Sequence, residues 1–115
     1  MIRKQSEMTM ETRENMRGGK GSIEINHIFR QEELSGKSRF CAKVIINPGC
    51  SIGMHEHSNE EEIYYIIRGQ GIVNDNGNIQ EVREGDAILT GGGASHSIEN
   101  TGTVPLELMA VILLY

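Results

Sequence analysis

Apolar and polar residues alternate along much of this chain, in short segments separated by turn-forming residues. In residues 22–29, for example, Ile23, Ile25, His27 and Phe29 fall on one face. Alternation with a period of two predicts a β-strand with one face turned to the core. The pattern predicts eight or nine strands, within residues 22–29, 40–46, 51–57, 62–68, 71–74, 79–82, 87–90, 96–100 and 106–114. Residues 31–34 are expected to form one helical turn or a loop.

The turn signals between these segments favour an all-β fold. The chain has 14 Gly and only 2 Pro, and Asn76-Gly77 is a strong signal for a tight hairpin. No segment of useful length has the period of a helix. With 115 residues, the chain fits a single domain built as a sandwich, a jelly roll or a small closed barrel. Residues 1–21, which are rich in charge and glycine, are expected to form a mobile or loosely docked arm before a domain at 22–115.

Composition excludes several classes of protein. The net charge is −5, which argues against nucleic acid as a partner, because phosphate-binding surfaces are usually basic. No apolar run is long enough to cross a membrane, and the charged N-terminus does not resemble a secretory signal. Two cysteines, Cys41 and Cys50, are too few for a disulfide scaffold. We therefore expect a cytoplasmic protein with both thiols reduced.

Three of the four histidines form a candidate metal site. His55 and His57 are two residues apart, so in a strand they project to the same face. Glu62 begins the next strand after a polar turn, and His96 begins a later one. Three imidazoles and one carboxylate suit a divalent first-row metal, with positions left open for water or substrate. In this interpretation Glu60 and Glu61 are solvated turn residues, although a shift of the turn by one residue would make Glu61 the ligand.

The spacing of these residues is more specific than their chemistry. Gly49, His55, His57, Glu62 and Gly69 are separated by five, one, four and six residues. Gly85 is followed by Gly93, His96 and Asn100, the last three separated by two and three residues. Over residues 23–113, the chain resembles the cupin superfamily, and specifically its small single-domain members. One difference is Gly91, which stands where the family usually has proline and is expected to loosen the loop over the pocket.

The resemblance implies a jelly-roll barrel (a double-stranded β-helix) with a metal inside, held by His55, His57, Glu62 and His96. The metal would be a divalent transition ion, either Mn, Fe, Zn or Ni. The implied function is that of a metal-dependent enzyme acting on a small carboxylate, sugar or sugar phosphate, as a decarboxylase, dioxygenase or isomerase. The alternative is a non-catalytic module that binds or senses a small molecule. Oxalate decarboxylation is disfavoured, because Ile52 occupies the position at which oxalate-active cupins usually carry arginine.

The alternation of side chains along a strand predicts which further residues point inward and which point outward. Tyr64 and Ile66 share the inward face with Glu62, so Tyr64 is a candidate catalytic side chain or a pocket wall. Ile63, Tyr65 and Ile67 should then point outward, as should Ile52 and Met54. An outward face this apolar is rarely left to water, and we expect a homodimer to cover it. His27 shares an apolar face, so a core or interface histidine with a satisfied partner is more plausible there than a metal ligand.

Overall fold

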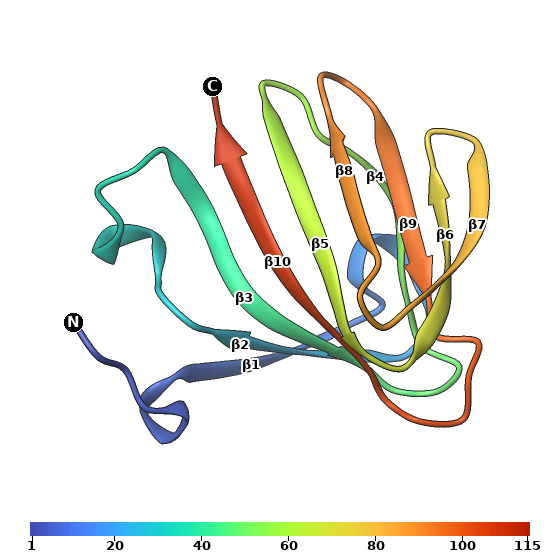
Figure 1. The fold of residues 1–115 in the computed structure, drawn as a ribbon, viewed down its shortest axis with the longest axis horizontal. Helices are drawn as coiled ribbons and strands as arrows, with labels where there is room; N and C mark the ends of the chain where they lie inside the picture. The colour runs from blue at the N-terminus through green and yellow to red at the C-terminus, as the bar shows by residue number, and fades with distance from the viewer.

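The computed structural model describes residues 1–115, which form two antiparallel sheets curved around one interior (Figure 1). The larger sheet has the order β1-β2-β3-β10-β5-β8, and the smaller has the order β4-β9-β6-β7. The strands are β1 (Thr9–Glu14), β2 (Ser22–His27), β3 (Ser38–Ile46), β4 (Ser51–Glu56), β5 (Glu60–Arg68), β6 (Gln70–Asp75), β7 (Asn78–Arg83), β8 (Ala87–Gly91), β9 (Ser95–Glu99) and β10 (Leu106–Leu114). This architecture confirms the predicted all-β jelly roll. No helix in it has the length and apolar character needed to span a membrane.

Three single turns of 3-10 helix complete the structure: η1 (Gln5–Glu7), η2 (Met16–Gly18) and η3 (Gln31–Glu33). The last of these lies where the sequence predicts a helical turn or a loop. The tight hairpin predicted at Asn76-Gly77 joins β6 to β7, with both residues at positive φ (51° and 96°). Asparagine and glycine tolerate this left-handed backbone better than other residues, which explains why the turn forms at this dipeptide.

The interior is lined by the inward faces of the strands. In β10, Leu106, Leu108, Ala110 and Ile112 are each at most 4% exposed. In β5, Tyr64 and Ile66 are buried, whereas Ile63, Tyr65 and Ile67 are 37–49% exposed. The predicted parity of β5 is therefore confirmed, and its outward face is apolar. Because β2 lies within the larger sheet, between β1 and β3, and turns Ile23 and Ile25 inward, it does not cover that outward face.

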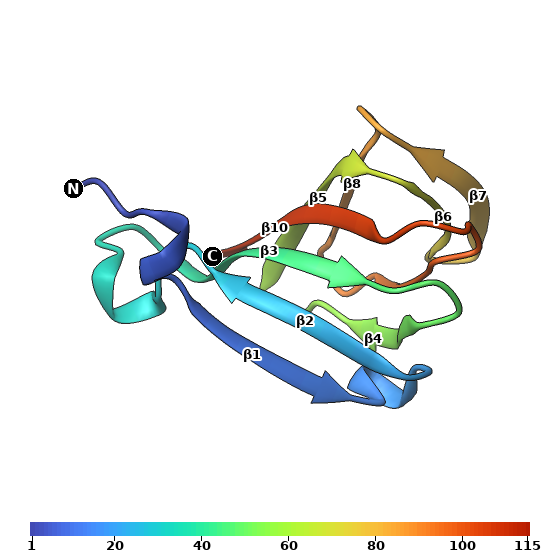
Figure 2. The same ribbon diagram turned by 90° about the horizontal axis from the view of Figure 1, so that it is seen from below.

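The N-terminal segment differs from the predicted loosely docked arm. Residues Thr9–Glu14 form β1, which pairs with β2 along its whole length, from Thr9↔His27 to Glu14↔Ser22. Figure 2 shows β1 running beside β2 and leading into a turn next to β4. Most residues of this strand are exposed on both faces, so its sequence lacks the alternation that reveals a half-buried strand.

A bulge in β4 corrects another expectation. Ile52 was predicted to point outward with Met54, yet Ile52 is 2% exposed and belongs to the core, while Met54 is 48% exposed. The pairing of β4 with β9 changes register between Ile52 and His55. One extra residue in a strand reverses the parity that follows it. Ile52 and His55 can therefore both face the interior although they are three residues apart.

Candidate metal centre

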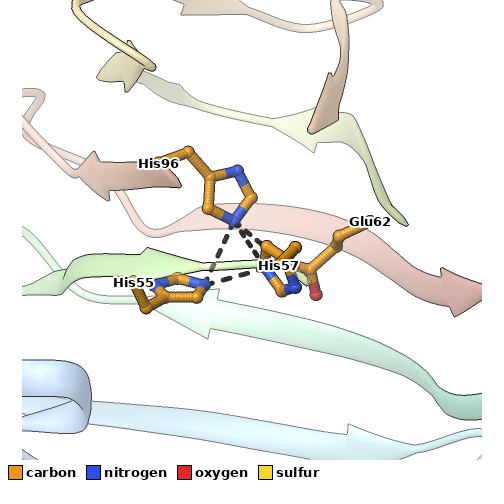
Figure 3. Close-up of side chains that lie close together, drawn as sticks. All are labelled: His55, His57, Glu62 and His96. Atoms are coloured by element: carbon orange, nitrogen blue, oxygen red, sulfur yellow. Dashed lines mark hydrogen bonds and ion pairs between the residues drawn. The ribbon is translucent and has the colours of Figure 1, made fainter. Parts of the chain in front are cut away.

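Four potential ligands from three parts of the fold meet inside the barrel (Figure 3). His55 lies on β4, His57 immediately follows that strand, Glu62 lies on β5, and His96 lies on β9. The imidazoles of His57 and His96 and the carboxylate of Glu62 are buried, at 4% exposure or less. The structure thus brings together all four residues that the sequence predicts as ligands. Glu61, the alternative ligand, does not belong to this cluster.

The spacing of the donor atoms suits a single metal ion. His96 Nε2 lies 3.1 Å from Nε2 of His55, 3.1 Å from Nε2 of His57 and 3.0 Å from Oε1 of Glu62. The same oxygen lies 3.1 Å from His57 Nε2 and 3.9 Å from His55 Nε2. Ligands at right angles around an ion with bonds of about 2.1 Å are separated by about 3.0 Å. The cluster therefore fits an N₃O donor set for a divalent transition metal, so it could bind one.

Two of the imidazoles make hydrogen bonds through Nδ1, the ring nitrogen that points away from the donor cluster, and these bonds fix their tautomers. His55 Nδ1 donates to the carbonyl oxygen of Gly53 at 2.7 Å, and His57 Nδ1 donates to Glu60 Oε2 at 2.5 Å. With the proton held on Nδ1, the lone pair of each Nε2 points toward the other donors, as a metal ligand requires. His96 Nδ1 is buried without a hydrogen-bond partner, so His96 is instead oriented by packing, including a ring of Tyr64 stacked at 4.8 Å.

Glu60 is a functional candidate that the sequence analysis missed. It was interpreted as a solvated turn residue, but it opens β5 and is only 9% exposed. Besides accepting from His57, it accepts two hydrogen bonds of 2.8 Å from the guanidinium of Arg39 on β3. The charge-assisted bonds from Arg39 and then His57 lower the pKa of Glu60 to about 2. An ionised carboxylate therefore links Arg39 to the ring of His57.

The local electrostatics keep the candidate ligands in complementary charge states. Burial alone would raise the pKa of Glu62, but its contacts with His55, His57 and His96 outweigh burial and lower that pKa below its usual range. The same contact with Glu62 raises the pKa of His57. An ionised carboxylate facing three imidazoles in a buried site favours a cation at the point where they meet.

A cavity of about 180 Å³ opens onto this cluster. That volume is below the range of about 300–1,000 Å³ typical of drug-sized ligands, so the cavity suits a small molecule. Its walls include both apolar and cationic side chains: Arg13, Met16, Arg17, His27, Arg39, Phe40, Val44, Ile52, Tyr64, Ala110 and Ile112. Tyr64 is 2% exposed, and burial followed by the charge of Glu62 raises the pKa of its phenol.

His27 lies at the cavity but outside the cluster. Its Nε2 is 3.0 Å from Glu11 Oε2 on the neighbouring strand β1, and its ring packs edge-on against Phe40. The expectation of a histidine with a satisfied partner is confirmed. The glycine that replaces the usual proline, Gly91, also has a local reason, because a Cβ there would lie 2.4 Å from Cβ of Glu61. Strands β5 and β8 approach too closely at this point for a side chain.

Comparison with known proteins gives a consistent picture. The family model described as "Cupin domain" matches residues 42–112. An oxalate-binding protein from Thermotoga maritima is 46% identical over 99% of this chain and 94% of its own length. A crystal structure of a predicted oxalate decarboxylase from the same organism superposes with a TM-score of 0.95, at 46% identity over the whole of both chains. The Cnp3 cupin domain of Schizosaccharomyces pombe shares the fold over 91% of this chain and 69% of its own, with a TM-score of 0.73 at 14% identity.

Proposed function

The chain belongs to the cupin family, and on that premise we propose that it is a metal-dependent enzyme acting on a small oxygen-rich substrate in the barrel interior. His55, His57, Glu62 and His96 would hold a divalent transition metal, either Mn, Fe, Zn or Ni. The observation that carries the proposal is the meeting of three Nε2 atoms and one carboxylate oxygen beside a small cavity. All four donor atoms lie within 4.8 Å of one another, and the other three lie 3.0–3.1 Å from His96 Nε2. The substrate would be a carboxylate, a sugar or a sugar phosphate.

The metal, when bound, supplies Lewis acidity and a fixed point of attachment for substrate oxygens. The chain's own residues would exclude water and supply the candidate catalytic side chain. Ile52 and Tyr64 exclude water from one side of the cavity, since both are 2% exposed and line it. We propose Tyr64 as the candidate catalytic side chain, because its phenol is buried on the inward face of β5, two residues from Glu62, and lines the cavity. The alternative, a pocket wall, would leave its ring merely stacked on His96.

A second function, the binding of a small carboxylate without turnover, is favoured by one observation. The relative that is 46% identical over nearly the whole chain is an oxalate-binding protein. In that case the same metal and cavity would serve as a receptor for a small acid, and Tyr64 would only shape its wall. We also propose a cytoplasmic location for either function, since Cys41 and Cys50 are both free thiols.

One set of measurements tests both functions. Metal analysis of purified protein should find close to one transition metal ion per chain, and its identity narrows the chemistry. Calorimetric titration of the metal-loaded protein with oxalate, and with sugar phosphates, should then identify a ligand that the metal-free protein does not bind. Turnover of that ligand, lost in Tyr64→Phe while the metal stays bound, would establish an enzyme. Binding without any product would support the receptor, and absence of stoichiometric metal would refute both.

We further propose that the protein is a homodimer. Ile63, Tyr65 and Ile67 of β5 lie beside Leu89 of β8, and all four side chains are between 37% and 60% exposed. A patch of this kind on one sheet face is usually covered by a partner, and a second copy would bring an identical patch. Residues 22–27 are already paired on both sides, so this strand is not available for addition to the sheet edge of a partner.

A charged residue in this patch should dissociate the dimer. Tyr65→Lys and Leu89→Lys are each expected to shift sedimentation equilibrium from dimer to monomer, because a buried unpaired ammonium is costly at an apolar interface. A stable interface should bury at least about 1,000 Å² in total. The matched control is Ile79→Lys, which is 64% exposed on β7 of the other sheet and should leave the dimer intact. A wild-type chain that stays monomeric at high concentration would rule the dimer out.

A further inference from the structure

Three arginines line the cavity beside the candidate metal centre, and two of them already have carboxylate partners. Arg39 is held by Glu60 through two hydrogen bonds, and Arg13 pairs with Glu11. Arg17 is different: it is exposed at the cavity that it lines, and it forms no side-chain hydrogen bond or ion pair within the chain. A lone guanidinium facing a ligand cavity is a ready partner for an anion, since its planar donors match a carboxylate.

The backbone around Arg17 is held in an unfavourable conformation that places this side chain. Asn15 and Arg17 both have left-handed backbone angles, with φ of 49° and 55°. Such a conformation is tolerated by asparagine but is costly for arginine, and it persists only where the surroundings enforce it. Strained residues of this kind are concentrated at functional sites, so the feature is a reason to ask what Arg17 does.

Two glycines allow the close backbone contacts that hold this conformation. A Cβ at Gly19 would lie 2.1 Å from the carbonyl oxygen of Ser51, and a Cβ at Gly53 would lie 2.1 Å from the carbonyl oxygen of Arg17. The η2 turn therefore rests directly on the backbone of β4, two residues before the candidate ligand His55. Lys20 adds hydrogen bonds to the same strand, because its N–H donates to Ser51 Oγ and its carbonyl accepts from the N–H of Ser51, both at 2.9 Å. Figure 2 shows this turn beside β4.

The charge of Arg17 acts within the cavity. Arg17 lines the same cavity as the candidate ligands His55, His57 and Glu62, so its positive charge lies beside the candidate metal centre. The paired arginines contribute little net charge, because Glu11 and Glu60 compensate them. A divalent ion with the Glu62 carboxylate would leave one net positive charge, and Arg17 adds a second. The ligand that balances this charge is a small dianion.

We propose that Arg17 is a specificity-determining residue that selects a small dicarboxylate over singly charged or neutral analogues. This inference rests on the proposed metal centre and names the ligand class that it would take. One carboxylate end of the ligand would be attached at the metal centre, and its outer oxygens would accept hydrogen bonds from the Arg17 guanidinium. The N-terminal segment would thus be part of the binding site and supply its charge selectivity.

The test compares two ligands of similar shape and different charge on Ni²⁺-loaded protein. Oxalate is a dianion, and in oxamate an amide replaces one carboxylate. Calorimetry should show that Arg17→Met weakens oxalate binding about 10-fold or more, as expected for a lost charge-assisted pair. Oxamate binding should change much less, so the preference for oxalate should shrink. Arg17→Lys keeps the charge at the same strained position and should retain most of the preference.

Controls separate this inference from the proposed function. Lys20→Met removes one positive charge from the same segment outside the cavity and should leave both affinities unchanged, which excludes a long-range effect of net charge. Ni²⁺ affinity should be the same in all variants. If wild type binds oxalate and Arg17→Met binds it equally well, or if Arg17→Met loses both ligands to the same extent, the role of Arg17 is refuted. If wild-type protein binds neither Ni²⁺ nor any carboxylate, the proposed function itself fails.

Discussion

Replacing His57 with alanine is expected to abolish stoichiometric metal binding. His57 Nε2 lies 3.1 Å from both His96 Nε2 and Glu62 Oε1, so its removal takes one of four donors from the cluster. Changes to groups that only orient a ligand already weaken metal binding by about 10- to 100-fold, and loss of a ligand should cost at least the upper end of that range. Metal analysis after gel filtration and direct calorimetric titration both measure the effect.

His27→Ala is the matched control for this experiment. His27 lines the same cavity, but its imidazole is paired with Glu11 and lies outside the donor cluster. This variant should keep the metal. A thermal melt adds a second readout, because an ion that binds only the folded state raises its stability. Added metal should therefore raise the Tm of wild type and of His27→Ala, but not that of His57→Ala. A His57→Ala protein that retains one metal per chain would show that the ligand assignment is wrong.

The parts of this fold that follow from local pattern were predictable. Inward and outward positions in β5 follow from strict alternation, and they place Tyr64 with Glu62 as expected. The hairpin at Asn76-Gly77 follows from the backbone preferences of two residues. The meeting of His55, His57, Glu62 and His96 was also expected, from parity within β4 and from the spacing that resembles the cupin motifs. Their ligation of a metal stays a prediction.

Other features depend on contacts between distant segments and leave no local signal. Strand β1 forms at a sheet edge, where neither face needs apolar residues, so Thr9–Glu14 shows no alternation. The burial of Ile52 depends on a bulge that only the pairing of β4 with β9 reveals. The position of Arg17 depends on two glycines, one in each of two segments that touch in the fold. The sequence contains these residues but does not show that they meet.

The local pattern predicted Glu60 to be a solvated turn residue, and this is its most consequential error. Replacing Glu60 should weaken metal binding without removing a ligand. Its carboxylate accepts the Nδ1 proton of His57 and is itself fixed by Arg39, which comes from β3, 21 positions earlier in the chain. This contact holds the ring of His57 in the tautomer whose Nε2 can bind a metal. Glu60→Gln removes the negative charge and leaves the side chain close to its original size. It should lower metal affinity by about 10- to 100-fold.

Glu61→Gln is the control, because Glu61 is adjacent in sequence but lies outside both the cluster and the Arg39 contact. It should bind metal as tightly as wild type, and a loss there would instead support the shifted register that makes Glu61 a ligand. Nitrogen-15 NMR of the histidine rings gives a readout that general destabilisation would not reproduce. Wild-type His57 should show a single tautomer protonated at Nδ1, and Glu60→Gln should show a mixture. Unchanged metal affinity with an unchanged tautomer in Glu60→Gln would mean that packing alone orients His57.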